Sequence, residues 1–414
     1  MSRLARLAVV TSHPIQNQTP WFRALAQVVD LEVLFCHRQD PAGQAAAGFG
    51  QPFEWDVPLV DGYRHRWLDN VAQQPQVASF GGCDTPSVGA VLRQGAFDAC
   101  IVTGWYLKSY LQAILACRQV KVPVMMRGDS QLGTPRPRWA KVAKYLPYRL
   151  LLDRVDAHLY VGKANRAYLR HYGVPSERLF FVPHFVDNGR FHEAADRARR
   201  DGSARRFLES AGVPVGATVF LFAGKLTPNK RATDLIQALA GLRACGRLVH
   251  GLIVGSGPEE GHLRAQAATL QAPVSFAGFR NQSEMPVTYA ASDCLVLPSS
   301  SETWGLVVNE AMACGLPAIV TDAVGSAPDL VDAGVTGFSY RAGEVPALWE
   351  SMARVLDHLE ADRGAFRPAV LAKIGRYDCD AAVTGTMTAL DAVTPAARRA
   401  AAEARPVLSR GHRL

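Results

Sequence analysis

The chain has 414 residues, a formal net charge of +8, 48% hydrophobic residues and 20% charged residues. This composition excludes a disordered chain, and the length favours two domains over a single core. The positive charge is compatible with an anionic substrate, an acidic membrane surface or a nucleic acid, and does not choose among them.

No segment approaches the roughly 18 apolar residues needed to cross a bilayer. The apolar run near the N-terminus is about one strand long, which is too short for the hydrophobic part of a signal peptide. The eight cysteines include no CxxC pair, and several lie in apolar runs, as Cys100 and Cys294 do. Buried reduced thiols explain this better than disulfides or zinc. We therefore expect a cytoplasmic protein, soluble or peripheral at the inner face of the membrane.

Short apolar runs alternate with helical patterns, which predicts βα repetition and parallel sheets. Helices are predicted at 21–29 and 107–119, and the polar, Arg-rich stretch 191–206 is interpreted as a linker with an early helix. Strands are predicted in the first half at 4–12, 31–37, 97–104, 122–128, 157–162 and 179–184. Strands are predicted in the second half at 218–224, 247–257, 274–279, 293–300, 316–322 and 337–340.

The sequence thus predicts an α/β protein with two Rossmann-like parallel-sheet domains. Parallel sheets bind ligands at the carboxyl ends of their strands, so we expect the domains to face each other across a central cleft. The expected domains are residues 1–186 and 187–376. Residues 377–414 are expected to form a C-terminal helix that returns toward the first domain, followed by a basic tail.

The most informative stretch is residues 298–322, PSSSETWGLVVNEAMACGLPAIVTD, between two predicted strands. A helix is predicted to start there, near Thr303 to Leu306. The unpaired N–H groups and positive dipole end of such a helix suit a diphosphate, and Gly305 permits close approach. We predict that Glu302, in the mouth, and Glu310, about two turns deeper on the same helix, bind sugar and ribose hydroxyls. The alternative is a capped helix with two surface glutamates.

This stretch resembles the E-x7-E signature of the retaining family-four glycosyltransferases of GT-B architecture. The segments FAGKLTPNKR, LIVGSGPE and VPHFVDNGRF are similar to further family motifs in the same order. The resemblance is close in the C-terminal half and loose in the N-terminal half. It implies that residues 1–186 form the acceptor-side domain and residues 187–376 the nucleotide-sugar donor domain.

Two lysines follow the first predicted strand of the second half. By resemblance, Lys225 stands in the family's usual arginine place and Lys230 in its lysine place. Fixed cations aimed at the diphosphate stabilise the negative charge that grows as the sugar leaves. Lys225 keeps the charge of an arginine but loses its bidentate geometry. Without the resemblance, solvated turn lysines would be the first interpretation.

Gly255 and Arg280 complete the predicted donor site. Gly255 lies in a tight loop that we expect to pass close to the nucleotide. Arg280 is predicted to pack on or hydrogen-bond the base, with an exposed arginine as the alternative. The glycines of GSGPEEG have the wrong spacing for GxGxxG, which argues against a Rossmann oxidoreductase.

The first half departs from the family pattern at two strand ends. His13 stands where the family usually has a Gly-rich loop, and it is predicted to contact the acceptor or the donor sugar, or else to be structural. After the strand at 122–128 the family commonly has a His-Asp pair, whereas this chain has Arg127 and Asp129. We expect Asp129 to keep the aspartate role. Arg127 is expected to replace the histidine or to bind an acidic acceptor.

The resemblance implies hexosyl transfer with retention at the anomeric carbon. In the front-face route proposed for the family, the departing phosphate takes the acceptor's proton and the protein supplies positioning and charge. We expect a nucleotide sugar as co-substrate, a glycan or lipid-linked envelope saccharide as acceptor, no cofactor and no metal. The predicted catalytic residues are Glu302, Lys230, Asp129, Arg127 and His13.

Residues 134–154 are rich in Arg, Lys and aromatic residues, and Pro147 is expected to interrupt their helix. A basic amphipathic helix of this kind can lie on an anionic membrane surface. The equal alternative is a helix that packs its apolar side on the core. The apolar residues that share one side at helical spacing are Trp139, Val142, Ala143, Leu146 and Leu150.

A catalytically impaired GT-B-like binding or assembly subunit is the alternative function, because the chain departs from the family at residues 127–130 and 225. The presence of Glu302, Glu310 and Lys230 counts against it. Nucleic-acid binding would explain the basic charge, but no recognition motif accompanies it, so we expect no nucleic-acid partner.

Overall fold

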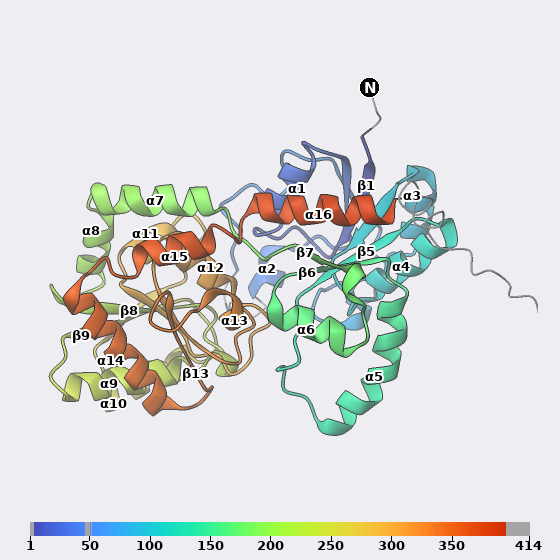
Figure 1. Cartoon of the computed structure of the whole chain (residues 1–414). Coiled ribbons are helices and arrows are strands. Elements are labelled where there is room, and N and C mark those ends of the chain that lie inside the picture. The colour runs from blue at the N-terminus through green and yellow to red at the C-terminus, as the bar shows by residue number, and fades with distance from the viewer. Residues whose placement is uncertain (1–3, 46–49, 51, 395–414) are drawn as a thin grey trace, which may run out of the picture.

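The computed structural model describes residues 4–45, 50 and 52–394. Within them, each predicted apolar run contains a strand, and each half forms its own parallel sheet with helices packed against it (Figure 1). The predicted pair of Rossmann-like sheets is therefore confirmed. The predicted basic tail from residue 395 lies outside the described residues.

The first sheet has seven parallel strands in the order β3-β2-β1-β4-β5-β6-β7. The order reverses between β1 and β4, and ligands bind at the carboxyl ends of strands beside such a reversal. Strand β3 has no counterpart among the predicted strands, because three residues are too few to show a pattern. The strands are β1 (Arg6–Thr11), β2 (Asp30–Phe35), β3 (His65–Trp67), β4 (Ala99–Val102), β5 (Val124–Gly128), β6 (Ala157–Tyr160) and β7 (Leu179–Phe181).

The second sheet has six parallel strands in the order β10-β9-β8-β11-β12-β13. Its order reverses between β8 and β11, so a second crevice is expected at their carboxyl ends. The strands are β8 (Thr218–Ala223), β9 (Val249–Val254), β10 (Val274–Gly278), β11 (Cys294–Leu297), β12 (Ala318–Thr321) and β13 (Gly337–Tyr340).

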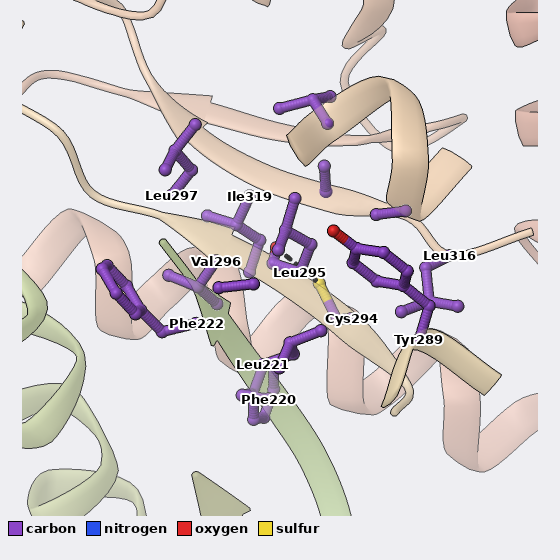
Figure 2. Close-up of a cluster of buried hydrophobic side chains, with 14 of the residues drawn as sticks. Phe220, Leu221, Phe222, Tyr289, Cys294, Leu295, Val296, Leu297, Leu316 and Ile319 are labelled. Carbon is purple, nitrogen blue, oxygen red and sulfur yellow. Dashed lines mark hydrogen bonds between the residues drawn. The ribbon is translucent and has the colours of Figure 1, made fainter. Parts of the chain in front are cut away.

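The centre of the second sheet is buried on both faces, as expected for a parallel sheet covered by helices. Phe220, Leu221 and Phe222 of β8 lie beside Cys294 to Leu297 of β11 in a continuous apolar cluster (Figure 2). This packing fixes the ends of β8 and β11, from which the candidate site is built. All eight cysteines are free thiols, and six of them are buried.

The helices of the first domain surround its sheet. The predicted helix at 21–29 is shorter than expected and ends at Leu25, whereas the one at 107–119 is present almost as predicted. The elements are α1 (Thr19–Leu25), α2 (Pro41–Gln44), α3 (Val88–Gly95), α4 (Lys108–Val120), α5 (Arg138–Asp153) and α6 (Lys163–His171), with 3-10 turns η2 (Phe80–Gly82) and η3 (Ser176–Arg178).

The predicted early helix in the Arg-rich stretch 191–206 is present, but the stretch is not a linker, so that part of the prediction is wrong. It belongs to α7 (Asn188–Arg200) and α8 (Ser203–Ser210), and α7 begins where the Asp187 side chain accepts a hydrogen bond from the Arg190 N–H at 3.0 Å. Phe191 and Ala195 are buried in the core of the second domain. The many arginines of this stretch hide the periodic pattern of the narrow buried face in the sequence. The two domains are joined instead by the short segment 182–187, which connects β7 to α7.

The remaining helices cover the second sheet, except for the last one. Helix α16 (Cys379–Val393) crosses back and packs against α1 and β7 of the first domain (Figure 1). The Trp21 indole N–H donates to the Thr386 hydroxyl at 3.2 Å across this contact. The others are α9 (Ala232–Ala244), α10 (Glu260–Thr269), α11 (Met285–Ala290), α12 (Leu306–Ala313), α13 (Ala327–Leu330), α14 (Val345–Ala361) and α15 (Arg367–Ile374), with the 3-10 turn η4 (Pro228–Lys230).

Helix α5 differs from both expectations for its sequence. It runs through Pro147 without ending, because the carbonyl that the proline leaves without a partner is that of Ala143, which is exposed to solvent. Its apolar stripe does not pack on the core either: Trp139 is 75% exposed, Leu146 61% and Leu150 53%. Among the described residues, no helix is long and apolar enough to cross a membrane.

Candidate active site

The site forms at the reversal of the second sheet, where the loops after β8 and β11 meet. Helix α12 begins at Leu306 after Gly305, whose φ is +90°. A side chain at Gly305 would meet Leu297 and Val324 at 3.0 and 3.1 Å, so glycine is required there. The first N–H groups of α12 lack acceptors within the helix and form a positive end. The sequence predicted a helix start near Thr303 to Leu306, and α12 begins at the last of these residues.

Lys230 and Glu302 lie together at this helix start. The Lys230 ammonium is hydrogen-bonded to the Glu302 carboxylate, and both side chains are largely buried. Lys225 lies near them: burial, followed by the charge of Lys230, lowers the pKa of Lys225. Two cations and one carboxylate thus meet at the end of β8. Contrary to the prediction, Glu302 is not on the helix of Glu310, because it precedes α12 and forms a β-bridge with Val324.

Glu310 lies on α12 and is held by two neutral donors. Its carboxylate accepts hydrogen bonds from the Tyr289 hydroxyl at 2.6 Å and from the Gln282 amide at 3.2 Å. Burial raises the pKa of Glu310 above its usual value, although both hydrogen bonds and the charge of Arg190 oppose the rise. The carboxylate is therefore a partly buried acceptor rather than a surface charge.

Glu310, Gly255 and Arg280 line one cavity of about 150 Å³. The cavity borders the lysine turn through Gly224 and the start of α12 through Val307. At Gly255 a side chain would lie 1.8 Å from the Gly224 carbonyl oxygen, so only glycine allows these two loops to approach. The Arg280 guanidinium is held over the Phe207 ring at 4.2 Å and pairs with Glu284 at 3.1 Å.

A second cavity, of about 120 Å³, adjoins the first and lies between the domains. It shares Glu310 and Gln282 with the first cavity and is also lined by Gln16, from the loop after β1. Glu310 therefore stands between a cavity in the second domain and a space that the first domain closes.

Asp129 also reaches the helix start, but from the first domain. The Thr303 hydroxyl donates to the Asp129 carboxylate at 2.9 Å, and the imidazole Nε2 of His184 lies 3.7 Å from the same oxygen. Burial would raise the pKa of Asp129, but His184, Thr303 and the charge of Arg127 together hold it below its usual value. Gln131 adds a further link, since its amide donates to the Glu302 carbonyl oxygen at 2.5 Å.

Arg127 points into the protein interior. Its guanidinium donates to the Pro183 carbonyl oxygen at 3.0 Å, lies 3.3 Å from the His184 ring and stacks over Trp21 at 4.9 Å. Burial lowers the pKa of Arg127 to about 10, so it remains charged at neutral pH. The histidine beside Asp129 that could take the place of the family's histidine is His184, which lies in the segment VPHFVDNGRF and was not predicted as a site residue.

His13 follows β1, as predicted, and its hydrogen-bond partner is Ser12 rather than a member of this cluster. Its Nδ1 is 3.0 Å from the Ser12 hydroxyl, and burial followed by the charge of His37 lowers the pKa of His13 to about 4. The imidazole is therefore neutral at physiological pH. The neighbours Pro14 and Gln16 line cavities, whereas His13 lines none of those described here.

The segment 53–56 is a part of the site that the sequence did not reveal. It belongs to the first domain but reaches the second: the Phe53 ring lies 4.5 Å from the Phe279 ring, and the Asn281 amide donates to the Glu54 carbonyl oxygen at 2.7 Å. Trp55 thereby lines the same cavity as Arg280 and Glu310. Only the paired aromatic residues in PFEWDVP could have signalled it.

The arrangement has the polarity of a site for a nucleoside diphosphate. Cations and helix N–H groups lie at one end, where a diphosphate would be stabilised. A buried carboxylate that accepts hydrogen bonds lies beside a partly aromatic cavity, which suits a ribose and a base. The structure thus brings together Glu302, Lys230, Lys225 and Asp129, and groups Glu310, Gly255 and Arg280 next to them.

Part of the chain is similar to proteins named as glycosyltransferases. Residues 204–365 match the family described as Glycosyl transferases group 1. The chain is 33% identical over 231 residues to the D-inositol 3-phosphate glycosyltransferase of Salinispora arenicola, covering 53% of this chain and 50% of that protein. It is 35% identical over 210 residues to the Streptomyces bingchenggensis protein of the same name, covering 48% and 44%. The chain thus spans about half the length of the curated relatives it matches.

Solved structures resemble the chain over nearly its whole length. A glycosyltransferase of Rickettsia africae has a TM-score of 0.73 at 13% identity, over 95% of this chain and 99% of that one. HepE of Anabaena, solved in complex with UDP, has a TM-score of 0.70 at 17% identity, over 94% and 100%. At these identities the likeness shows the fold alone. The protein has the GT-B fold, as the resemblance of its sequence predicted.

Proposed function

We propose that this protein is a retaining glycosyltransferase that moves a hexose from a nucleoside diphosphate sugar to a saccharide or lipid-linked acceptor at the cytoplasmic face of a membrane. The observation that carries the proposal is the Lys230–Glu302 pair at the start of α12, next to Lys225 and to the cavity of Glu310. The family match over residues 204–365 covers all of these groups.

Each group has one role in this proposal. Lys225, Lys230 and the first N–H groups of α12 stabilise the diphosphate as its charge grows. Glu310 accepts hydrogen bonds from the ribose hydroxyls, and Arg280 packs beside the base. Glu302, which touches Lys230, binds sugar hydroxyls. Relatives named for D-inositol 3-phosphate and a fold neighbour solved with UDP support this use of the site.

Retention follows from a front-face reaction. The bond from the anomeric carbon to the diphosphate breaks while the acceptor oxygen bonds to the same face, and a diphosphate oxygen takes the acceptor's proton. The protein contributes position and charge. Asp129, held by Thr303 and close to His184, is the first-domain carboxylate nearest to this reaction and orients the acceptor or the sugar.

A nucleotide panel tests the proposal. The melting temperature of the full chain is measured with UDP-, GDP-, ADP- and dTDP-sugars, because a ligand that binds only the folded state raises it. We expect one base to raise the melting temperature and its sugar to be hydrolysed or transferred, with the anomeric configuration of the product retained in its NMR spectrum. Binding without transfer or hydrolysis would favour the impaired subunit. No shift with any sugar nucleotide would contradict the proposal.

We also propose that α5 docks on an anionic membrane surface. Its apolar stripe faces solvent, and its sequence carries four basic residues and one acidic residue, Asp153. An exposed stripe flanked by cations is the pattern of an interfacial helix. This helix lies at the outer edge of the first domain, where a flat surface can reach it (Figure 1).

Flotation with vesicles tests this contact. We expect the protein to float with vesicles of phosphatidylglycerol and phosphatidylcholine, and Leu146→Ser to reduce the floated fraction severalfold. The matched control is Leu248→Ser, because Leu248 is 59% exposed and Leu146 61%. The membrane proposal fails if the wild-type protein stays at the bottom, or if both variants lose flotation equally.

A further inference from the structure

A third cavity, of about 350 Å³, opens in the first domain between α5, α6 and the loop after β5. We call it the basic pocket. Its lining includes Arg136, Lys141 and Lys144 and the rings of Tyr148 and Tyr168. None of the residues assigned to donor binding lines it.

The charge of the basic pocket is unbalanced. Three permanent cations line it, together with His171, and no acidic side chain does. Within the described ranges, Arg136, Lys141 and Lys144 form no ion pair with a carboxylate. Lys144 is held over the Tyr148 ring at 5.5 Å. Like charges gathered without a counter-charge repel one another, and a bound anion relieves that cost.

The basic pocket adjoins the proposed transfer site. Thr303 lines it and at the same time donates to Asp129 at 2.9 Å. Gln131 lines it and donates to the Glu302 carbonyl oxygen at 2.5 Å. A molecule bound in the pocket is therefore next to the loop that carries Glu302, on the side of the first domain. The cavity lined by Arg280 and Glu310, which we call the nucleotide cavity, is a separate one.

Helix α5 forms one wall of the basic pocket. Lys141, Lys144 and Tyr148 recur at helical spacing and face the pocket, whereas the exposed stripe of Trp139 and Leu146 lies on the opposite side of the helix. A helix with its side chains is about 10 Å across. If the stripe lies in a membrane interface, the pocket is at the level of the lipid headgroups.

We propose that the basic pocket binds a phosphate or diphosphate group of the sugar acceptor. The inference rests on the proposed glycosyl transfer and narrows it, since the acceptor becomes a phosphorylated compound. Arg136 offers paired donors and the lysines offer point charges, a set suited to an anion of two or three charges. With the group anchored there, the acceptor's hydroxyl reaches toward Asp129 and Glu302.

Calorimetry with inorganic pyrophosphate tests the pocket on the full chain. Because the donor site also binds diphosphates, the titration is repeated on Lys225→Ala/Lys230→Ala. We expect binding to persist in that variant and to weaken about tenfold or more in Arg136→Gln/Lys144→Gln. The control Arg138→Gln/Arg149→Gln removes equal charge from α5 outside the pocket lining and should bind as the wild type does. Circular dichroism checks that each variant is folded.

Two outcomes overturn the inference: no pyrophosphate binding in Lys225→Ala/Lys230→Ala, or equal binding in Arg136→Gln/Lys144→Gln and the wild type. Both are distinct from a failure of the proposed function, which is the absence of nucleotide binding in the thermal panel. A second titration identifies the kind of molecule that carries the phosphate. Tighter binding of farnesyl diphosphate than of pyrophosphate assigns a lipid carrier, and equal binding assigns a soluble phosphorylated sugar; both results support the phosphate site.

Discussion

The two sheets have similar strand orders, but the sites at their carboxyl ends are built differently. In the second domain, Glu302, Gly305 and Glu310 come from one loop and helix, and the two lysines come from one turn. In the first domain, Asp129 is completed by His184 and by Thr303, which lie far away in the sequence. The residues proposed to bind the donor thus come from a local motif, whereas those proposed for the acceptor side come from distant segments.

Lys230→Ala is expected to have the largest effect. Removing one fixed cation aimed at the leaving diphosphate should lower the rate of transfer or donor hydrolysis by about 10²- to 10³-fold. The control is Lys373→Ala, which removes a lysine that pairs with Asp332 at 2.5 Å elsewhere in the second domain. Equal rates for Lys230→Ala and the control would remove the lysine from the catalytic role.

Glu310 gives the second prediction, a dependence of nucleotide affinity on pH. In the proposed complex, the ionised Glu310 carboxylate accepts hydrogen bonds from both ribose hydroxyls. Burial raises the pKa of this carboxylate above the usual 4.5. Affinity is therefore complete above the raised pKa and is lost as the pH falls through it. Glu310→Gln should weaken binding about 10-fold at neutral pH and flatten this dependence. Calorimetry from pH 4.5 to 7.5 measures both, and an unchanged slope in the variant would contradict the role.

Trp55 tests whether the first domain contributes to the donor cavity. The substitution Trp55→Ala should weaken nucleotide binding about fivefold or more, because the packing of an aromatic ring on a base contributes about 1–3 kcal/mol. Trp139→Ala is the matched control, since Trp139 is 75% exposed on α5 and distant from the nucleotide cavity. If Trp55→Ala binds nucleotides like the control, the second domain holds the donor without help from the segment 53–56.

The smallest effect is expected at the contact between the two domains. Thr303→Val removes the hydrogen bond to Asp129 and should destabilise the protein by about 1 kcal/mol. It should also raise the pKa of Asp129, because Thr303 helps to hold that value down. Thermal unfolding compares it with Thr388→Val, which loses a hydrogen bond to the Thr384 carbonyl oxygen on the exposed side of α16. Equal stability of the two variants would show that the Thr303–Asp129 hydrogen bond contributes no more to stability than the exposed hydrogen bond of Thr388.

The same contrast explains what could be predicted from the sequence. Apolar runs specify the buried strands, and a glycine before an apolar helix specifies the start of α12, because both are local signals. The position of His184 beside Asp129 and the reach of Trp55 across the cleft depend on how two domains pack, which no local pattern encodes. The Arg-rich stretch 191–206 was mistaken for a linker because its small buried residues, such as Ala195, give a weak periodic signal.

Helix α5 shows the opposite case, in which the sequence left two interpretations equal and the structure excludes one of them, the packing of the stripe on the core. Its stripe has the spacing of a core helix, yet Leu146 and Leu150 face solvent while Lys141 and Lys144 face the basic pocket. Periodicity shows that a helix has two faces but does not say which one is buried.

The central claim is that the diphosphate of a donor binds between Lys225, Lys230 and the start of α12. Calorimetry tests it most directly by comparing a nucleoside diphosphate, chosen from the thermal panel, with its nucleoside. We expect the diphosphate to bind about 100-fold more tightly to the wild type, and this advantage to shrink to about tenfold or less in Lys225→Ala/Lys230→Ala. The same advantage in both proteins would contradict the account.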